Sequence, residues 1–282
     1  MILEDEFGDI IQKARSGLGK SKKEIAEAAG IALRRLEQLE GCLGQPKEDE
    51  VAGLGHMLGL DEAKLLDIAL GRWSPSEPPK SFFDSVIVVT GDVGGYKVNG
   101  YIIFDKISKD AAMIDTANNT SRMLAALKAR SLKLRFVFLT HAHHDHIGDL
   151  ARFEKDIDAD IYIGEEELKA GSRGRWKGLK GDETFSLGSI LIRSIFAPGH
   201  TNGSISYVAP ASPAGGNDIC FVGDTIFAGS VGRSNPASLY PTLLRSLRER
   251  ILSLDDRCLL APGHGPITSV GDEKKHNPFF NP

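Results

Sequence analysis

Apolar side chains in the first seventy residues recur every three or four positions, which is the spacing of amphipathic helices. One such group runs from Phe7 to Ala14, and another starts after Ser21, with Glu24 three residues further on. A serine and a glutamate at this distance form the capping-box pattern of a helix N-terminus. This part of the chain is therefore predicted to be a small all-α domain. Its helices are expected within 7–14, 21–29, 31–40, about 48–58 and about 61–70.

The helical pattern stops at the segment from Trp73 to Pro79, where three prolines interrupt the chain. Proline in a helix interior removes a hydrogen bond and clashes with the preceding turn, so this segment is predicted to be a linker. The expected division is a helical domain over residues 1–72, a linker over 73–80 and a second domain over 81–282. Because the candidate chemistry lies beyond the linker, residues 79–282 are expected to fold and act alone.

After the linker, short runs rich in Val, Ile and Phe alternate with longer helical stretches. Strands are predicted over 85–89, 98–105, 111–114, 134–139, 160–163, 190–196, 205–208, 219–222 and 258–260. Helices are predicted over about 118–130, 145–154 and 239–253. Alternating strands and helices predict an α/β sandwich of sheets covered by helices.

The predicted strand over 134–139 leads directly into four candidate metal ligands, His141, His143, Asp145 and His146. Two histidines one residue apart can turn their imidazoles toward a single cation where the chain leaves a strand. The Asp-His pair that follows faces a second cation beside the first. Imidazole nitrogen and carboxylate oxygen are ligands that suit zinc, with iron and manganese as alternatives.

Three further candidates, His200, Asp224 and His264, each follow a predicted strand and stand beside a glycine. A glycine allows the backbone to turn closely around a site, and binding residues often lie on loops that a rigid scaffold positions. The sequence therefore predicts one site with seven ligands from four separate loops.

The motif H-x-H-x-D-H, followed by a distant His, Asp and His, resembles the metallo-β-lactamase superfamily over residues 82–282. The resemblance implies the αβ/βα sandwich of that family and two divalent metal ions, zinc in the first place. By the same resemblance Asp224 bridges both ions. One ion would be held by His141, His143 and His200, and the other by Asp145, His146 and His264.

Such a pair of ions, about 3.5–4 Å apart, lowers the pKa of a bridging water from about 15.7 toward about 7. The resulting hydroxide attacks a carbonyl carbon, so the chain needs no serine or cysteine nucleophile. We expect Asp145 to orient this hydroxide and to move a proton to the leaving group.

Asp224 also argues against a true β-lactamase, because the antibiotic-hydrolysing branch of the family has Cys or Ser at the bridging position. The segments 225–233 and 271–279 resemble small glyoxalase II-like hydrolases, which implies a small thioester as substrate. A lactone is the alternative. His264 is followed by Gly265-Pro266 rather than by the acidic and aromatic pair of glyoxalase II. This difference leaves open which thiol forms the thioester of the substrate. A nuclease is less favoured, because residues 73–282 have no net charge and nucleases of this fold carry a basic arm.

Two basic regions are candidates for substrate binding. The segment 165–180 carries Arg173 and Arg175 beside Trp176, a composition that suits a carboxylate with an apolar neighbour. We expect this segment to form one wall of the pocket, and the alternative is a solvated loop. Arg233 either binds substrate or supports the metal loop.

The helical segment 21–40 resembles the helix-turn-helix of phage-repressor-like DNA-binding domains. In that family the second helix enters the major groove, where this chain would present Arg34, Arg35 and Gln38. Residues 1–72 carry ten basic and fourteen acidic side chains, however, and the net charge of −4 disfavours a polyanionic partner. A protein contact or a homodimer interface is the alternative. With DNA binding, the chain would be a regulator whose hydrolase half senses a metabolite.

The overall composition is that of an ordinary globular protein of 282 residues, with 41% hydrophobic residues and a net charge of −4. The three cysteines, Cys42, Cys220 and Cys258, are far apart and form no metal-binding pair. No apolar run approaches membrane-spanning length, and the acidic N-terminus differs from a signal peptide. We therefore expect a cytoplasmic protein without membrane contact.

Overall fold

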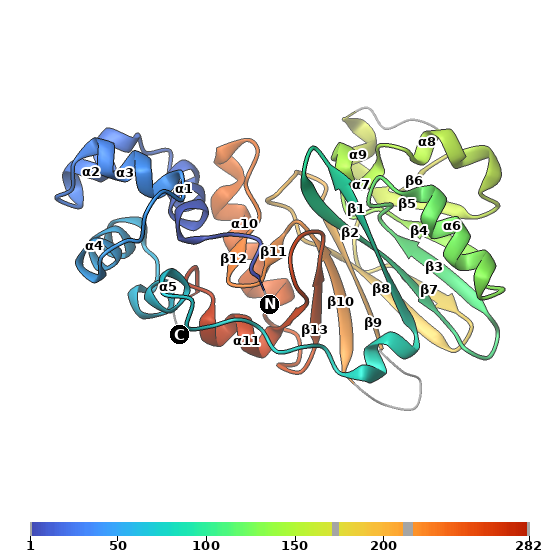
Figure 1. Ribbon diagram of the computed structural model, residues 1–282. Helices are drawn as coiled ribbons and strands as arrows, with labels where there is room; N and C mark the ends of the chain where they lie inside the picture. Colours follow the sequence, from blue (N-terminus) through green and yellow to red (C-terminus); the bar gives the residue numbers. More distant parts are fainter. Residues whose placement is uncertain (1, 171–174, 211–216, 281–282) are drawn as a thin grey trace.

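A computed structural model describes residues 2–170, 175–210 and 217–280. Five helices form a bundle beside a sandwich of two sheets (Figure 1). The helices of this bundle are α1 (Phe7–Gly17), α2 (Lys22–Ala28), α3 (Leu33–Glu40), α4 (Glu48–Leu58) and α5 (Glu62–Ala69). We call residues 2–72 the helical region.

The boundaries of the bundle helices follow from local capping. The Ser21 hydroxyl accepts a hydrogen bond from the Glu24 N–H, and the Glu24 carboxylate accepts one from the Ser21 N–H at 2.8 Å. This pair is the capping box expected from the sequence. The Asp61 side chain caps α5 by accepting a hydrogen bond from the Lys64 N–H, and α4 ends at Gly59, whose φ of 68° is left-handed. These three boundaries each have a residue whose chemistry suits it, whereas α3 starts after Ala32, which has no side-chain cap.

Two six-stranded sheets make up the sandwich. The first sheet runs in the order β1-β2-β3-β4-β5-β6 and the second in the order β14-β13-β10-β9-β8-β7. The strands of the first are β1 (Val86–Val93), β2 (Tyr96–Phe104), β3 (Asp110–Ile114), β4 (Lys133–Phe138), β5 (Asp160–Gly164) and β6 (Lys177–Leu179). Those of the second are β7 (Thr184–Leu187), β8 (Ile190–Phe196), β9 (Ile205–Pro210), β10 (Asp218–Gly223), β13 (Leu259–Pro262) and β14 (Thr268–Ser269). Large buried side chains such as Phe138, Tyr207 and Phe221 fill the space between the sheets.

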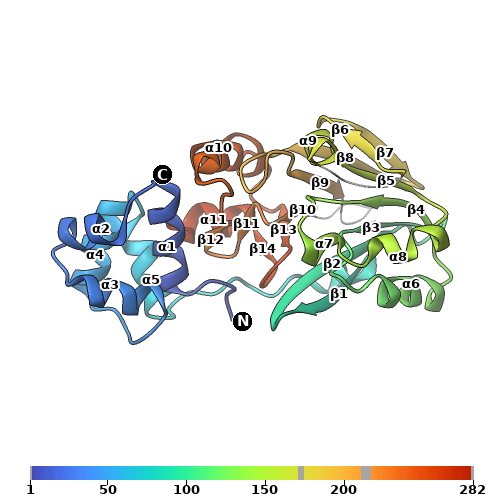
Figure 2. The same ribbon diagram turned by 90° about the horizontal axis from the view of Figure 1, so that it is seen from above.

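Helices cover both outer faces of the sandwich. Those on the first sheet are α6 (Thr120–Ala129), α7 (His144–Ile147) and α8 (Leu150–Phe153), while α9 (Glu165–Lys169) follows β5. The second sheet is covered by α10 (Tyr240–Ser246), α11 (Val270–His276) and a small hairpin of β11 (Ile226–Phe227) and β12 (Ser230–Val231). Figure 2 shows α10, α11 and this hairpin between the helical region and the sheets. The expected α/β sandwich is therefore confirmed.

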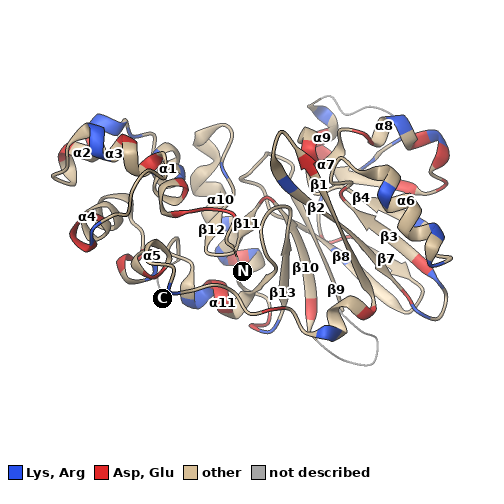
Figure 3. Ribbon diagram, in the orientation of Figure 1, with Lys and Arg blue, Asp and Glu red and all other residues tan. Residues whose placement is uncertain are grey.

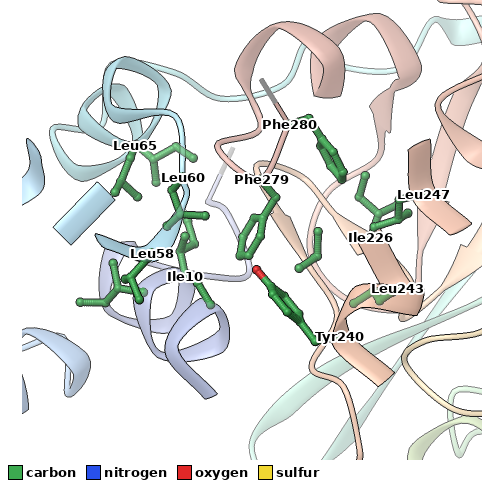
Figure 4. Close-up of a cluster of buried hydrophobic side chains, with 14 of the residues drawn as sticks. Ile10, Leu58, Leu60, Leu65, Ile226, Tyr240, Leu243, Leu247, Phe279 and Phe280 are labelled. Carbon is green, nitrogen blue, oxygen red and sulfur yellow. The ribbon is translucent and has the colours of Figure 1, made fainter. Parts of the chain in front are cut away.

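The helical region and the sandwich share one hydrophobic core. A single cluster of buried residues includes Ile10 and Leu65 from the bundle together with Tyr240, Leu243 and Phe279 from the sandwich side (Figure 4). Hydrogen bonds cross the same boundary: the Asp61 N–H donates to the Pro278 carbonyl at 2.8 Å, and the Lys64 ammonium donates to the Lys274 carbonyl at 3.0 Å. This shared core argues against the expectation that residues 79–282 fold alone.

Several short elements differ from the sequence-based expectation. The segment 165–180, expected as one wall of the pocket with a solvated loop as the alternative, contains α9 and β6 in its described part. The helix expected over 145–154 is broken at Gly148 and Asp149 into α7 and α8, and the Asp149 carboxylate accepts hydrogen bonds from the Thr120 N–H and hydroxyl. Among the described residues, no helix is both long and apolar enough to cross a membrane.

Candidate metal centre

The seven candidate ligands come together where strands of both sheets end. Parallel pairing of β10 with β13 places Gly223 opposite Pro262, so Asp224 and His264 leave the second sheet side by side. In the first sheet, parallel pairing of β3 with β4 brings the loop containing His141 to the same edge as Asp115. A Cβ atom on Gly263 would lie 2.3 Å from the Asp224 Oδ1 atom, so only glycine permits this approach.

One group of ligand atoms belongs to His141, His143, His200 and Asp224, which all lie within 4.8 Å of one another. The Nδ1 atom of His143 is 3.0 Å from His141 Nε2 and 2.9 Å from His200 Nε2. His200 Nε2 is in turn 3.3 Å from His141 Nε2 and 3.8 Å from Asp224 Oδ2. Three ring nitrogens therefore converge on one point, with a carboxylate oxygen beside them.

A second group consists of Asp145, His146, His264 and, again, Asp224. His264 Nε2 lies 3.1 Å from Asp145 Oδ2 and 3.5 Å from Asp224 Oδ2. His146 Nε2 lies 3.2 Å from Asp224 Oδ1. The Asp224 carboxylate thus belongs to both groups, with one oxygen toward His146 and the other toward His200 and His264.

Two buried atoms, His146 Nε2 and Asp224 Oδ1, test whether these groups fit metal ions, because they lie 3.2 Å apart yet neither forms a hydrogen bond of acceptable geometry among the described residues. Leaving such a group unsatisfied costs about 1–3 kcal/mol, and native proteins rarely tolerate it without reason. A divalent cation held by imidazole nitrogens and carboxylate oxygens satisfies both atoms, and this donor set suits zinc, iron or manganese. The residues therefore fit divalent metal ions.

The pKa values of the histidines differ between the two groups of ligands. Burial lowers the pKa of His200 to about 4 and the pKa of His141 well below its ordinary value, which keeps both imidazoles neutral, as metal ligands must be. Burial also disfavours the charged form of His264, but hydrogen bonds to Asp145 and Asp224 outweigh it and raise the pKa to about 10. The carboxylates of the second group therefore attract positive charge, and a bound cation supplies the same charge.

Hydrogen bonds behind the ligands fix which ring nitrogens face the site. The Asp115 carboxylate lies 2.8 Å from His146 Nδ1 and also accepts the Thr140 N–H and hydroxyl. The carbonyl oxygen of Arg233 lies 2.7 Å from His200 Nδ1, and that of Lys97 lies 2.6 Å from His264 Nδ1. Each contact turns the Nε2 atom of a histidine toward the centre, which is the usual role of groups behind a metal ligand.

Two further residues brace the ligand loops. The buried Glu167 carboxylate accepts the Ala142 N–H at 3.1 Å and the Gly203 N–H at 3.0 Å, so it joins the loop of His143 to the loop of His200. Asn99 braces the loop of His264 through its N–H, which donates to the Gly263 carbonyl at 2.7 Å. Asp115, Glu167 and Asn99 were not among the site residues predicted from the sequence.

A pocket of about 400 Å³ opens above the ligands, and its walls come from both parts of the molecule. Tyr96 lines it from the start of β2, and Arg233 lines it from the segment after Asp224. Glu4, Asp5 and Lys13 line it from the helical region. No sequence pattern indicated this contribution of the N-terminal residues.

The match to a family model follows this geometry. The model described as "Metallo-beta-lactamase superfamily" matches residues 93–264, which include all seven candidate ligands. The chain belongs to the metallo-β-lactamase superfamily. The helical region lies outside the matched residues.

Within the superfamily, the chain is similar to proteins named as hydroxyacylglutathione hydrolases. It is 29% identical to "Hydroxyacylglutathione hydrolase GloC" of Haemophilus influenzae, with 67% of this chain and 95% of that protein covered. It is 38% identical to "Hydroxyacylglutathione hydrolase" of Bartonella henselae, with 58% of this chain and 62% of that protein covered. A similar solved structure is that of "BLEG-1 B3 metallo-beta-lactamase", with 26% identity, a TM-score of 0.59, and coverage of 70% of this chain and all of that one. Another is "TTHA1623 in a di-iron-bound form", with 27% identity, a TM-score of 0.58, and coverage of 69% of this chain and all of that one.

The structure separates the basic residues predicted to bind substrate. Arg233 lines the metal pocket, where its guanidinium donates to the Gln12 side chain at 2.5 Å. Arg175 is exposed and lines a different hollow, with Ala151, Glu154 and Lys155. Arg173 lies outside the described residues. The described part of the segment 165–180 contributes no residue to the metal pocket.

The residues predicted to contact DNA lie on α3. Arg34 is exposed and Gln38 is half-buried, whereas Arg35 forms two hydrogen bonds of 2.8 Å to Glu50 and one of 2.8 Å to the Gln45 carbonyl. Figure 3 shows the basic residues of α2 and α3 interspersed with acidic ones. The Arg35 guanidinium is therefore already hydrogen-bonded to other residues of the bundle. DNA binding stays a prediction.

Proposed function

We propose that the protein is a hydrolase that uses two divalent metal ions to cleave a small thioester. The observation that carries this proposal is the Asp224 carboxylate, which belongs to both ligand groups and leaves one buried oxygen without a partner among the described residues. A carboxylate whose Oδ2 atom lies near His200 of one group and His264 of the other, and whose Oδ1 atom lies near His146, suits a shared ligand. The names of the relatives as hydroxyacylglutathione hydrolases support a thioester as the substrate class.

His141, His143 and His200 would hold one ion, Asp145, His146 and His264 the other, and Asp224 both. When bound, the ions supply Lewis acidity, which polarises the scissile carbonyl and lowers the pKa of an attacking water. Zinc is the first expectation, and the similarity to a solved structure in a di-iron-bound form supports iron as an alternative.

Asp145 is the residue we assign to proton movement. Its Oδ2 atom is 3.1 Å from His264 Nε2, and its side chain is 27% exposed, so it reaches the pocket while remaining attached to the ligand group. A carboxylate in this place can accept a hydrogen bond from the attacking water and pass a proton to the leaving sulfur. Thiolates are good leaving groups, so only modest assistance is needed from this residue.

The remaining pocket residues suit an acyl group with an anionic part. Tyr96 and Phe227 offer apolar surface, while the Arg233 guanidinium is exposed at the pocket edge. Guanidinium binds carboxylates in a bidentate manner, so a substrate with a free carboxylate is favoured over a neutral one.

A hydrolysis panel tests this function. The purified protein is loaded with zinc or iron and assayed on a hydroxyacyl thioester, a lactone and a cephalosporin, with metal-stripped protein as the control. We expect metal-dependent turnover that is fastest with the thioester. Faster turnover of the lactone would change the substrate class, and equal turnover by the metal-stripped protein would contradict the metal mechanism.

A further inference from the structure

The ten-residue segment from Asp224 to Arg233 supports two ligands at once. It starts with the shared carboxylate of Asp224 and ends with the Arg233 carbonyl that lies 2.7 Å from His200 Nδ1. Its ends are in close contact, because a Cβ atom on Gly232 would lie 1.7 Å from the Asp224 carbonyl oxygen and 3.3 Å from His200 Nδ1. A movement of this segment therefore displaces both Asp224 and His200.

The tip of this segment, the β11–β12 hairpin, is held by the helical region. The Lys13 ammonium donates to the Val231 carbonyl at 2.9 Å and lies 4.6 Å from the centre of the Phe227 ring. The Ser230 hydroxyl donates to the Asp5 carboxylate at 2.5 Å, and Asp5 also accepts a hydrogen bond from Lys13. Figure 1 shows the N-terminal stretch running along this hairpin.

Burial makes these contacts different from ordinary surface ion pairs. Lys13 is 8% exposed and Asp5 is 7% exposed, although both belong to residue types that usually lie in water. Breaking a buried pair by removing one partner leaves an uncompensated charge and is strongly destabilising. Lys13 and Asp5 are thus fixed in place, and they fix the hairpin residues that they contact.

From its other side, the same hairpin is held by the sandwich. The buried Glu273 carboxylate accepts the Gly229 N–H at 3.0 Å, and the Asn277 side chain donates to the Ser230 carbonyl at 2.9 Å. The hairpin therefore lies between two sets of hydrogen bonds. The set on the helical side comes from residues that precede the segment matched by the family model.

We propose that Lys13 and Asp5 are positioning residues of the metal centre, through which the helical region holds the segment 224–233 and so places Asp224 and His200. This proposal rests on the metal site of the proposed function, but not on its substrate. The helical region then helps to hold the metal ligands in place, whether or not it also binds DNA or another protein.

The test compares Lys13→Met with Lys23→Met in the full-length protein. Methionine is an unbranched side chain only one heavy atom shorter than lysine and carries no charge. Lys23 is an exposed lysine of the same region, 75% exposed in its side chain. Zinc affinity is measured by competition with a chelator, and hydrogen exchange is followed at the amides of residues 226–233. We expect Lys13→Met to weaken zinc binding about tenfold, as is usual for residues behind a ligand, and to speed up exchange. Lys23→Met should match the wild type in both.

The double variant Asp5→Asn/Lys13→Met keeps the proposal testable if Lys13→Met fails to fold, because it leaves no unpaired buried charge. It too should bind zinc more weakly and exchange faster at 226–233. Wild-type affinity and exchange in a folded Lys13→Met or double variant would overturn the proposal. If the wild type binds zinc but cleaves no thioester, the proposed substrate fails while the positioning role stands. If the wild type binds no zinc, the proposed function and the positioning of a metal centre fail together, and the exchange data report only on the hairpin.

Discussion

The sandwich and the helical region line the same pocket but contribute different kinds of residue. The sandwich contributes all seven candidate ligands. Asp145 and His146 lie on the short helix α7, the other five lie on loops that follow strands, and all seven fall within the family match. The helical region contributes Glu4, Asp5 and Lys13, and the last two contact the segment behind Asp224. The candidate metal ligands therefore lie in the part of the chain that matches the superfamily. The helical region lies outside that match and contributes to the shape and rigidity of the pocket.

The largest expected effect comes from removing the helical region. Residues 79–282 alone would expose Tyr240, Leu243, Phe279 and Phe280, which are now buried against the bundle. Burial of each large apolar side chain contributes about 1.5–3 kcal/mol, and a domain is stable by only about 5–15 kcal/mol. We therefore expect the fragment to aggregate or to unfold without cooperativity, as seen by light scattering and thermal denaturation. A monodisperse fragment with wild-type zinc affinity would show that the two regions are independent.

A smaller effect is expected within the sandwich from Glu167→Gln, with Glu166→Gln as the matched control. The Glu167 carboxylate is buried and accepts two backbone N–H groups, whereas its neighbour Glu166 is exposed. An amide presents a donor to one of those N–H groups, so the free energy of unfolding should fall by about 1–3 kcal/mol. Zinc affinity should fall together with the stability, because the hydrogen bonds that join the loops of His143 and His200 are weakened. Identical unfolding curves for the two variants would contradict this role.

The pH dependence of stability tests the sandwich side of the hairpin. Burial raises the pKa of Glu273 from 4.5 to about 7. Because the folded state holds this proton more tightly than the unfolded state, protonated Glu273 makes its full contribution to the free energy of unfolding below pH 4.5. It is lost as the pH rises through about 7, up to a total on the order of 3 kcal/mol.

Denaturant unfolding between pH 4.5 and 8 measures this contribution. The slope over that range should flatten in Glu273→Gln, which cannot ionise. Replacement of an exposed glutamate, Glu249→Gln, should leave the slope unchanged. Equal slopes in all three proteins would mean that Glu273 does not titrate in this range.

The smallest effect is expected for Arg233→Ala, which removes the guanidinium but keeps the backbone carbonyl beside His200. We expect KM for acidic thioesters to rise about tenfold with little change in kcat, the pattern of lost ground-state binding. Neutral thioesters should be unaffected. Arg175→Ala is the control, because that side chain lies in a different hollow. An equal rise in KM for acidic and neutral substrates would leave Arg233 without a role in charge recognition.

The sequence predicted the ligands better than their supports, for a physical reason. His141, His143, Asp145 and His146 fall within six consecutive positions, and His200, Asp224 and His264 each follow an apolar strand beside a glycine. Such local patterns are visible along the chain. The contact between Lys13 and Val231 joins residues that are 218 positions apart, and Lys13 belongs to no motif.

The short elements were missed for a related reason. The hairpin strands β11 and β12 have two residues each, and β6 has three, so no period can be recognised in them. Arg175 and Trp176 suggested a binding wall by composition alone, yet β6 pairs with β5 at the edge of the first sheet, away from the metal pocket. Composition identified a basic segment but gave no information on which way it faces.

The central claim, two metal ions that share Asp224, is tested most directly by the metal content per chain of the wild type, Asp224→Ala and Asp218→Ala. Asp218 is an exposed aspartate at the start of β10, the strand that Asp224 follows, and serves as the matched control. After loading with zinc and removal of excess metal, the wild type and Asp218→Ala should each retain two ions, and Asp224→Ala should retain fewer than two and lose thioester turnover. Two ions and an unchanged rate in Asp224→Ala, or a single ion in the wild type, would contradict the account.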